Sequence, residues 1–198
     1  MKKTLGLILG LIAIDQLIKI WVKTSMRIGE GFPLLGNALE IYFIENNGMA
    51  WGMEFGGEGG KIALTLFRLL AVGGIFYLLY DMLKKGPLNL MSVGLAMVFA
   101  GALGNIIDSV FYGQLFSESN RFFVAETFPE TGYAPWLQGK VVDMFFFNIR
   151  WPESMGGSLI FPPIWNFADA CISIGVACML LFSFFKRKDS APETKPTS

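Results

Sequence analysis

Four long apolar stretches constrain the fold of this chain more than any other feature of its sequence. They cover residues 5–22, 62–83, 90–112 and 164–185. Each is close to the roughly 17–25 residues that a helix needs to cross a lipid bilayer. Charged residues make up only 16% of the chain, against about 25% in an ordinary soluble domain. We therefore predict an all-α membrane protein, in which a four-transmembrane-helix bundle forms a single domain over residues 1–188.

The first stretch also has features of a signal peptide, because Lys2 and Lys3 precede its apolar core. However, Asp15, Gln16 and Lys19 interrupt its later half, and no cleavage pattern of small residues follows it. We therefore expect this segment to be retained as the first span.

Basic residues gather on one side of the four predicted spans. They lie before the first span, between the second and the third, and after the fourth: Lys2, Lys3, Lys84, Lys85, Lys186, Arg187 and Lys188. The positive-inside rule makes that side cytoplasmic. The segments on the opposite side, residues 23–61 and 113–163, carry six basic and ten acidic residues. Both termini are therefore expected in the cytoplasm, and the polar residues 189–198 are expected to form a disordered cytoplasmic tail.

The two outer segments contain short stretches with a different pattern. Residues 38–45 and 140–151 are rich in β-branched and aromatic residues, which is typical of strands. We predict that they form a small extracytoplasmic β-sheet at the outer membrane surface. Residues 113–139, here called the inserted segment, show no pattern that assigns them a structure.

The absence of histidine excludes several kinds of catalytic site. A chain with no histidine cannot contain a Ser-His-Asp triad, a Cys-His dyad, an HExxH zinc site or another histidine-ligated metal. Cys171 and Cys178 lie seven residues apart in one apolar stretch, a spacing that fits two turns of a helix rather than a metal or redox motif. The 16 basic residues balance the 16 acidic ones, so no nucleic-acid surface is expected. We expect no metal and no cofactor, and chemistry that uses carboxylates, amides, hydroxyls or lysine.

Ionisable residues within the spans need an explanation, because each raises the free energy of inserting the helix into the membrane by about 2.5–3.5 kcal/mol. Asp15 and Lys19 lie four residues apart on one face of the first span. They could form a structural ion pair, Lys19 could extend to the membrane surface, or both could support a functional site. Arg68 and Asp81 lie near opposite ends of the second span, where contact with the membrane interface is the ordinary explanation.

Two further polar pairs lie near the outer ends of spans. Asn105 and Asp108 are three residues apart in the third span, and Asn166 and Asp169 have the same spacing in the fourth. Hydrogen bonding between helices is the alternative to function for the first pair. Capping of the helix N-terminus is the alternative for Asp169, although a helix that starts at residue 164 places Asp169 rather deep for that role.

The outer segments contribute two more candidate features. Asp143 interrupts a hydrophobic strand, where aspartate is uncommon. A position on the outward face of an alternating strand would explain it without a function. Asn46 and Gly48 belong to a sequence that is most simply a turn.

The predicted topology brings these groups to one membrane boundary. Asp143 precedes the fourth span on the outer side, and Asp169 lies near the outer end of that span. Three amide side chains are expected at the same level: Asn46, Asn105 and Asn166. Two carboxylates that share a proton can hydrolyse an amide bond, because the ionised one takes a proton from water and the protonated one polarises the carbonyl. The sequence therefore predicts a two-aspartate hydrolytic site.

Five short polar blocks occur between residues 15 and 169 of the chain. In order they are Asp15-Gln16-x-x-Lys19, Asn46-x-Gly48-x-Ala50-Trp51-Gly52, Gly104-Asn105-x-x-Asp108, Val141-Val142-Asp143 and Asn166-x-Ala168-Asp169. Each block alone is a weak signal. Together, and in this order, they resemble the lipoprotein signal peptidase (signal peptidase II) family of bacterial membrane aspartic proteases.

The resemblance implies roles for these residues. Asp143 and Asp169 would be the catalytic dyad. The residues that bind substrate or support the site would be Asp15, Lys19, Asn46, Gly48, Asn105, Asp108 and Asn166. The active site would lie at the outer face of the bacterial cytoplasmic (inner) membrane.

The resemblance also implies partners. The substrates would be prolipoproteins whose cysteine already carries a diacylglyceryl group, cleaved on the amino-terminal side of that cysteine. Membrane lipid and globomycin-type inhibitors would be further partners, and nucleic acid would not. We expect the protein to be a monomer.

The chain departs from the family pattern at two places. The block that ends at Asp108 usually continues with arginine, but Ser109 follows here. Arg121 or Arg150 could supply the missing guanidinium. The connection between Asp108 and Asp143 is also longer than usual in the family, so the inserted segment is an elaboration that could serve as a lid or a partner surface.

Two other classes of function remain as alternatives. A small proton- or cation-coupled transporter subunit would use Asp15, Asp108 and Asp169 as an ion path. It would need ionisable residues at several depths, and beyond Asp15 none continues to the cytoplasmic side. A non-catalytic assembly factor would bind a partner through its outer sheet and would tolerate Asp143→Asn.

Overall fold

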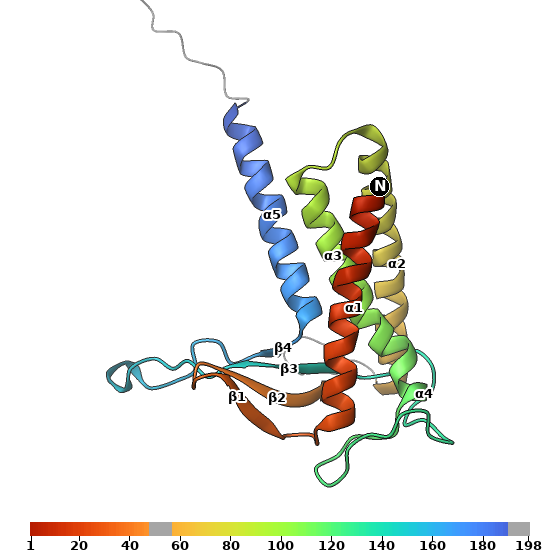
Figure 1. Cartoon of the computed structure of the whole chain (residues 1–198), viewed down its shortest axis with the longest axis vertical. Helices are drawn as coiled ribbons and strands as arrows, with labels where there is room; N and C mark the ends of the chain where they lie inside the picture. Colours follow the sequence, from red (N-terminus) through yellow and green to blue (C-terminus); the bar gives the residue numbers. More distant parts are fainter. Residues whose placement is uncertain (48–56, 190–198) are drawn as a thin grey trace, which may run out of the picture.

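The computed structural model describes residues 1–47 and 57–189. Its long helices are α1 (Lys2–Ser25), α2 (Gly57–Lys85), α3 (Leu90–Ile107) and α5 (Phe167–Asp189). Within the described residues, four helical segments are long and apolar enough to cross a membrane. They confirm the predicted four-helix membrane fold (Figure 1). Gly48 and the predicted tail beyond Asp189 lie outside the described residues.

Three of the predicted spans begin at other residues in the structure. Helix α1 begins at Lys2 rather than at residue 5, and α2 begins at Gly57 rather than at residue 62. Helix α5 begins at Phe167 rather than at residue 164, because Ile164–Trp165 form strand β4. The backbone of these two residues pairs with the neighbouring strand instead of entering the helix.

The third span continues past the end of α3 without a break. Asp108–Tyr112 form a π-helical turn, η2, and Gly113–Leu115 form the short helix α4. At the other end, the side-chain Oδ1 of Asn89 accepts a hydrogen bond from the backbone N–H of Ser92 at 2.9 Å and so caps α3. A π-helical turn is rare and often marks a functional site.

A four-stranded antiparallel sheet adjoins one end of the helices. Its strands are β1 (Gly31–Leu35), β2 (Leu39–Asn46), β3 (Val141–Phe147) and β4, and they lie in this order across the sheet. Strands β2 and β3 confirm the two predicted strands, although β3 ends at Phe147 rather than at residue 151. Strand β1 was not predicted because Pro33 within it argues against a strand, and β4 has only two residues.

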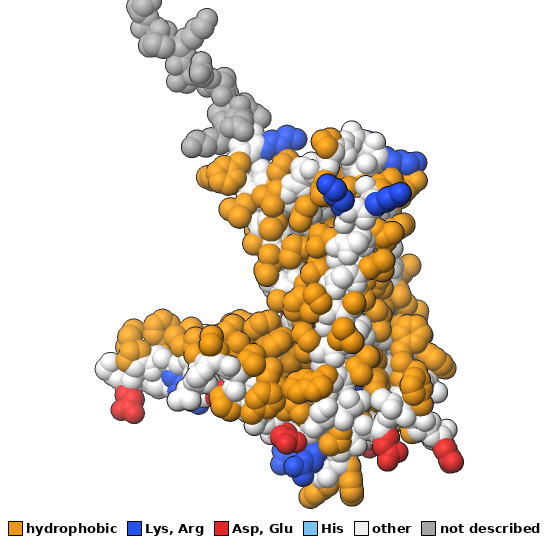
Figure 2. Space-filling view, viewed as in Figure 1, with side chains coloured by type: hydrophobic (Ala, Val, Ile, Leu, Met, Phe, Trp, Pro, Cys, Tyr) orange, Lys and Arg blue, Asp and Glu red, His pale blue; other side chains and the backbone are white. Residues whose placement is uncertain are grey.

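The sheet extends sideways from the helices and has two unlike faces. In Figure 1 it extends to one side from the lower ends of α1 and α5. Figure 2 shows hydrophobic side chains over the face that turns toward the helices, acidic and some basic side chains on the opposite face, and basic side chains at the far end of the helices. This polarity fits a sheet that lies on the surface of the membrane crossed by the helices.

Glycines bring α3 and α5 into backbone contact. A Cβ atom built on Gly94 would lie 2.5 Å from the backbone oxygen of Gly175, and one built on Gly101 would lie 2.3 Å from that of Ala168. No side chain fits at such distances, so these positions require glycine. Small residues that let two helices approach closely are typical of helix pairs in membranes. The contact at Gly101 places the second half of α3 directly against the start of α5.

The inserted segment packs back onto the end of the third span. The backbone N–H of Gly139 donates a hydrogen bond to the carbonyl of Ser109 at 2.8 Å. A Cβ atom on Gly139 would lie 2.1 Å from the backbone oxygen of Asp108. The segment is therefore fixed to the turn that carries Asp108, which the sequence did not predict.

A buried ion cluster holds the same segment to the sheet and to α1. The Nζ of Lys23 forms an ion pair with Glu45 of β2 and donates a hydrogen bond to the Oγ of Ser119 at 2.9 Å. The Ser119 hydroxyl also donates to Oε1 of Glu45 at 2.9 Å, and the ring of Tyr133 lies 4.9 Å from Nζ. Lys23 is fully buried, so its charge depends on these partners.

Candidate active site

Two aspartates from different elements meet at the sheet end of the helices. Asp143 lies in β3, and Asp169 lies in the first turn of α5. The side chain of Asn166 contacts both of them. Its Nδ2 donates to Oδ1 of Asp143 at 2.6 Å, and its Oδ1 accepts a hydrogen bond from the backbone N–H of Asp169 at 3.0 Å. The structure therefore brings both acids of the predicted pair to the same asparagine.

Asp143 is buried, with only 2% of its surface exposed. The outward-facing position considered as an alternative is therefore wrong. Burial, and then the negative charge of Asp169, raise the pKa of Asp143 to about 7. Hydrogen bonds from Asn166 and Asn46 act in the opposite direction. The Nδ2 of Asn46 donates to Oδ2 of Asp143 at 3.2 Å.

Asp169 is half-buried and takes part in a reciprocal cap of α5. Its Oδ2 accepts a hydrogen bond from the backbone N–H of Asn166 at 3.3 Å, while the side chain of Asn166 accepts one from the backbone N–H of Asp169. This is the pattern of a capping box. The sequence argument that Asp169 lies too deep to cap a helix was wrong, because α5 starts at Phe167 rather than at residue 164.

Asn105 of α3 joins the two halves of the site. Its Nδ2 donates to Oδ1 of Asp169 at 2.9 Å, and its Oδ1 accepts from Nδ2 of Asn166 at 3.1 Å. The same Oδ1 accepts a hydrogen bond from Nζ of Lys19 at 2.7 Å. The orientation of the Asn105 amide is thereby fixed, with its N–H group toward the acid.

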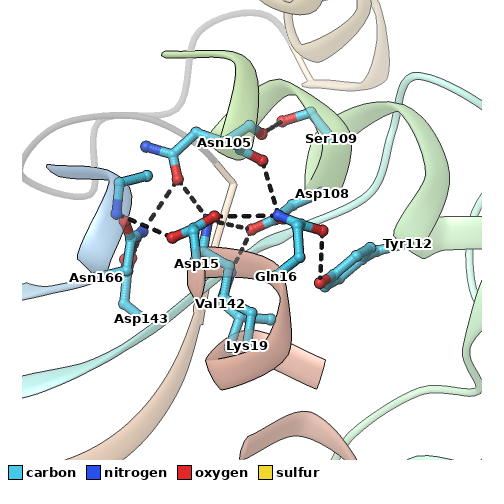
Figure 3. A network of polar contacts seen from close by, with 12 residues as sticks. Asp15, Gln16, Lys19, Asn105, Asp108, Ser109, Tyr112, Val142, Asp143 and Asn166 are labelled. Carbon is cyan, nitrogen blue, oxygen red and sulfur yellow. Dashed lines mark hydrogen bonds and ion pairs between the residues drawn. The ribbon is translucent and has the colours of Figure 1, made fainter. Parts of the chain in front are cut away.

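Lys19 is the centre of a buried network beneath the acids (Figure 3). Its Nζ lies 3.0 Å from Oδ2 of Asp15 and 2.8 Å from Oδ2 of Asp108, and all three side chains are at most 2% exposed. The alternative in which Lys19 extends to the membrane surface is therefore wrong. One buried ammonium group therefore forms ion pairs with two buried carboxylates.

Each of these two carboxylates accepts a hydrogen bond from the backbone N–H of the residue that precedes one of the acids. Oδ2 of Asp108 accepts a hydrogen bond from the backbone N–H of Val142 at 3.3 Å, next to Asp143. Oδ1 of Asp15 accepts one from the backbone N–H of Ala168 at 2.9 Å, next to Asp169. The network thus fixes the positions of both acid-bearing segments relative to each other.

The sequence analysis assigned no role to two neighbours of this network. The Nε2 of Gln16 donates to Oδ1 of Asp108 at 3.0 Å, and the hydroxyl of Tyr112 donates to Oε1 of Gln16 at 3.1 Å. Both are visible in Figure 3. Gln16 stood in the first block quoted above, whereas Tyr112 carries no signal beyond its place after Asp108 in the third span.

Arg68 of α2, which the sequence analysis placed near one end of the second span, is half-buried. Ser109, which stands where the family has arginine, donates its hydroxyl to the backbone carbonyl of Asn105 at 3.1 Å and contacts neither acid in this way.

Of the nine predicted site residues, six lie around the two acids and one cannot be placed. Gly48 lies outside the described residues. Among residues 1–47 and 57–189, no group of three or more His, Cys, Asp or Glu side chains is arranged to hold a metal ion. Asp15 and Asp108 share Lys19 rather than facing an open path through the bundle, which speaks against the transporter alternative.

Comparisons with known proteins agree with this arrangement. The family model described as signal peptidase (SPase) II matches residues 7–185. A lipoprotein signal peptidase of Porphyromonas gingivalis is 42% identical over 190 residues, which cover 91% of this chain and 82% of that protein. A lipoprotein signal peptidase of Amoebophilus asiaticus is 31% identical over 189 residues, covering 90% and 76%.

The fold is also similar to that of a solved structure. A bacterial membrane enzyme determined by the in meso method at 2.3 Å resolution superposes with a TM-score of 0.64 and is 26% identical, covering 100% of this chain and 96% of that one. The matched family model spans nearly the whole chain, from the first helix to the last. This chain therefore belongs to the signal peptidase II family, multi-pass bacterial membrane proteases of the aspartic class.

Proposed function

We propose that this protease removes the signal peptides of prolipoproteins whose cysteine carries a diacylglyceryl group, and that it cleaves the bond before that cysteine. Asp143 and Asp169 are the catalytic pair in this proposal, and a water molecule is the nucleophile. The observation that supports it is a chain of amide hydrogen bonds between the two acids: Asn166 donates to the carboxylate of Asp143 and to Asn105, and Asn105 donates to the carboxylate of Asp169.

The reaction follows from the shared proton of the pair. The ionised aspartate takes a proton from water, whose oxygen attacks the scissile carbonyl carbon. The protonated aspartate donates to the carbonyl oxygen, which gives a tetrahedral intermediate. The proton gained from water then passes to the cysteine nitrogen as the carbon–nitrogen bond breaks, and one hydroxyl of the intermediate returns a proton to the other aspartate, which leaves a carboxylic acid and restores the pair.

The remaining site residues act by binding or by support. Asn46, Asn105 and Asn166 supply N–H groups that orient the two carboxylates. Asp15, Lys19 and Asp108 fix the backbone beside them. Gly48 contacts substrate in this proposal, on the basis of its place in the quoted sequence block alone.

The site faces the extracytoplasmic side of the inner membrane in this proposal, with both termini in the cytoplasm. The basic side chains at the opposite end of the helices support this orientation (Figure 2). A lipid-anchored substrate then approaches within the membrane plane, with its scissile bond at the depth of the acids. The protein acts as a monomer, and globomycin-type peptides occupy the same site.

Cleavage of a defined substrate tests this proposal. A synthetic diacylglyceryl prolipoprotein peptide is incubated with the purified protein in detergent, and the products are identified by mass spectrometry. We expect cleavage just before the lipidated cysteine, equal rates with and without a metal chelator, and inhibition by globomycin. Asp143→Asn and Asp169→Asn should abolish it, whereas Asp81→Asn, an exposed aspartate paired with Lys85, should not.

Other outcomes would favour other functions. Undiminished cleavage by Asp143→Asn would remove that residue from the catalytic role and make Asp108 the next candidate. A folded parent protein that does not cleave the peptide would refute the proposal and favour the transporter or assembly-factor alternatives. Labelling of single cysteines placed near Lys2 and near Glu153 in intact cells tests the orientation, and only the second should react with an impermeant reagent.

A further inference from the structure

The buried ion cluster of Lys23, Glu45 and Ser119 adjoins the end of β2 that reaches the acids. In Figure 1, β2 lies beside the lower end of α1, the helix that carries Lys23. Glu45 precedes Asn46, the last residue of β2, and the Nδ2 of Asn46 donates to Oδ2 of Asp143 at 3.2 Å. Successive side chains of a strand point to opposite faces. The same strand end therefore presents Asn46 to the acid and Glu45 to the cluster.

This strand end is separated from the rest of β2 by a shift in register. Leu39–Ile41 pair with the second half of β3, and Ile44–Asn46 pair with Val141–Asp143 after the shift. A shift of this kind interrupts the ladder of backbone hydrogen bonds. The last three residues of β2 are therefore held by a short run of pairs, and their position depends more strongly on side-chain contacts.

Glu45 supplies such contacts in three directions. Lys23, near the end of α1, forms an ion pair with it. The hydroxyl of Ser119 in the inserted segment donates to its Oε1 at 2.9 Å, and the Nζ of Lys140, just before β3, lies 3.5 Å from its Oε2. The side chain of Glu45 is only 3% exposed, and buried pairs are screened little by salt. This carboxylate thus fastens the end of β2 to α1 and to the inserted segment.

We propose that Glu45, Lys23 and Ser119 are positioning residues, which hold the end of β2 so that the amide of Asn46 meets the carboxylate of Asp143. The inserted segment then takes part in orienting the site through Ser119. This rests on the proposed two-aspartate function and adds three residues to it. The physical reason is that groups around reacting atoms must be placed accurately, since a misplacement of about 1 Å can lower a rate roughly a hundredfold.

Stabilisation of the fold alone is the alternative role for the cluster. A buried ion pair is weak evidence for stability, because apolar side chains of similar size often replace it without loss. A second contact near the strand end comes from α2, where the Nζ of Lys61 donates to Oδ1 of Asn47 at 3.1 Å. The variants below leave that contact in place, so they test the cluster alone.

The values of kcat and KM for cleavage of the lipidated peptide test this inference. The double variant Lys23→Met with Glu45→Met replaces both charges by apolar side chains of similar length, so neither charge stays buried without its partner. We expect a Tm close to that of the parent and an unchanged KM, because the cluster does not contact substrate. We expect kcat to fall roughly tenfold or more, because the amide of Asn46 is no longer held against the acid.

A mutant cycle shows whether the cluster acts through Asn46. In the Asn46→Ala background, the same double replacement should have little further effect on kcat, because the amide that the cluster positions is already gone. A general loss of folded protein would instead lower kcat by the same factor in both backgrounds.

A milder variant applies if the double variant folds poorly. Ser119→Ala keeps the ion pair and removes only the hydroxyl of the inserted segment, which contacts both Lys23 and Glu45. It should lower kcat, though less than the double variant does. Ser119→Thr retains a hydroxyl and should keep kcat near the parent value.

Glu40→Gln is the matched control in the same strand. Glu40 accepts a hydrogen bond from Nδ2 of Asn148 at 2.8 Å, and it precedes the register shift. Loss of its charge should therefore leave kcat and KM unchanged.

The results distinguish the two proposals. A parent that cleaves the peptide and loses activity on Asp143→Asn supports the dyad, whatever the cluster does. The role of the cluster alone is overturned by a folded double variant with the kcat of the parent, by an equal loss of kcat in both backgrounds, or by a Ser119→Ala variant that cleaves as fast as the parent. A folded parent that does not cleave the peptide refutes both.

Discussion

Replacement of Lys19 by methionine tests how far the buried network stabilises the protein. The ammonium lies within 3.0 Å of two carboxylates, and the three side chains are at most 2% exposed. Methionine matches the length of the aliphatic part and removes the charge, which leaves Asp15 and Asp108 buried without their cation. Loss of one partner of a buried ion pair costs about 3–5 kcal/mol, because the remaining charge is left uncompensated.

Thermal unfolding in detergent measures this effect. For a chain of this size, 1 kcal/mol corresponds to roughly 2–4 °C in Tm, so the expected decrease is roughly 6–20 °C. Lys85→Met serves as the matched control, because this lysine pairs with an exposed aspartate and exposed pairs contribute about 0–1 kcal/mol. Its Tm should stay within a few degrees of the parent value.

A second substitution distinguishes charge from packing. If uncompensated charge causes the loss, the double variant Lys19→Met with Asp108→Asn should be more stable than Lys19→Met alone, because one of the two buried charges is gone. The reasoning would be refuted by a Lys19→Met variant that unfolds within 2 °C of the parent, or by a double variant that is less stable than the single one.

Three further predictions follow from other parts of the molecule. Because the pKa of Asp143 is raised to about 7 from its ordinary value of 3.8, folding favours its protonated form. The free energy of unfolding should therefore fall as pH rises from about 4 to 7 and then level off. The slope of Tm against pH over this range should be smaller in Asp143→Asn, and an unchanged slope would contradict the assignment. Gly101→Ala should cost about 1–3 kcal/mol by overpacking, since its Cβ would meet α5, whereas Gly73→Ala, which has open space around it, should be neutral in the same unfolding assay. Lys23→Met should release the inserted segment from the sheet, so limited trypsin digestion should cut faster after the exposed Arg121; equal digestion rates would show that the ion cluster does not hold the segment.

The sequence predicted the bundle well because its signals are long and local. Each span is a run of apolar residues, and the length of the run reports the thickness of the bilayer. The ends of the helices were less predictable. Ile164 and Trp165 are as apolar as the residues of α5, and they leave the helix because their backbone pairs with β3. Where α5 begins therefore depends on pairing with another strand, which no local sequence pattern indicates.

In the site, too, local sequence signals were predictive, whereas contacts between distant segments were not. The block order and the depletion of charge in the spans located Asp143 and Asp169, because an acid in an apolar setting is conspicuous. The hydrogen bond from Tyr112 to Gln16 could not be predicted, since it depends on the rotation of the third span relative to α1. The burial of Lys23 with Glu45 depends likewise on how the inserted segment folds back, which is a non-local property of the chain.

The pairing of Asp15 with Lys19 also bears on how the protein is made. Synthesis proceeds from the N-terminus, so α1 reaches the membrane before Asp108 of the third span has been translated. At that moment the only described counter-charge within reach of Lys19 is the one that α1 carries itself, 3.0 Å away and one turn earlier. Because this ion pair is neutral overall, α1 can be inserted into the lipid before the third span is made. When the third span packs against α1, Asp108 adds a second carboxylate to Lys19 and completes the three-residue network.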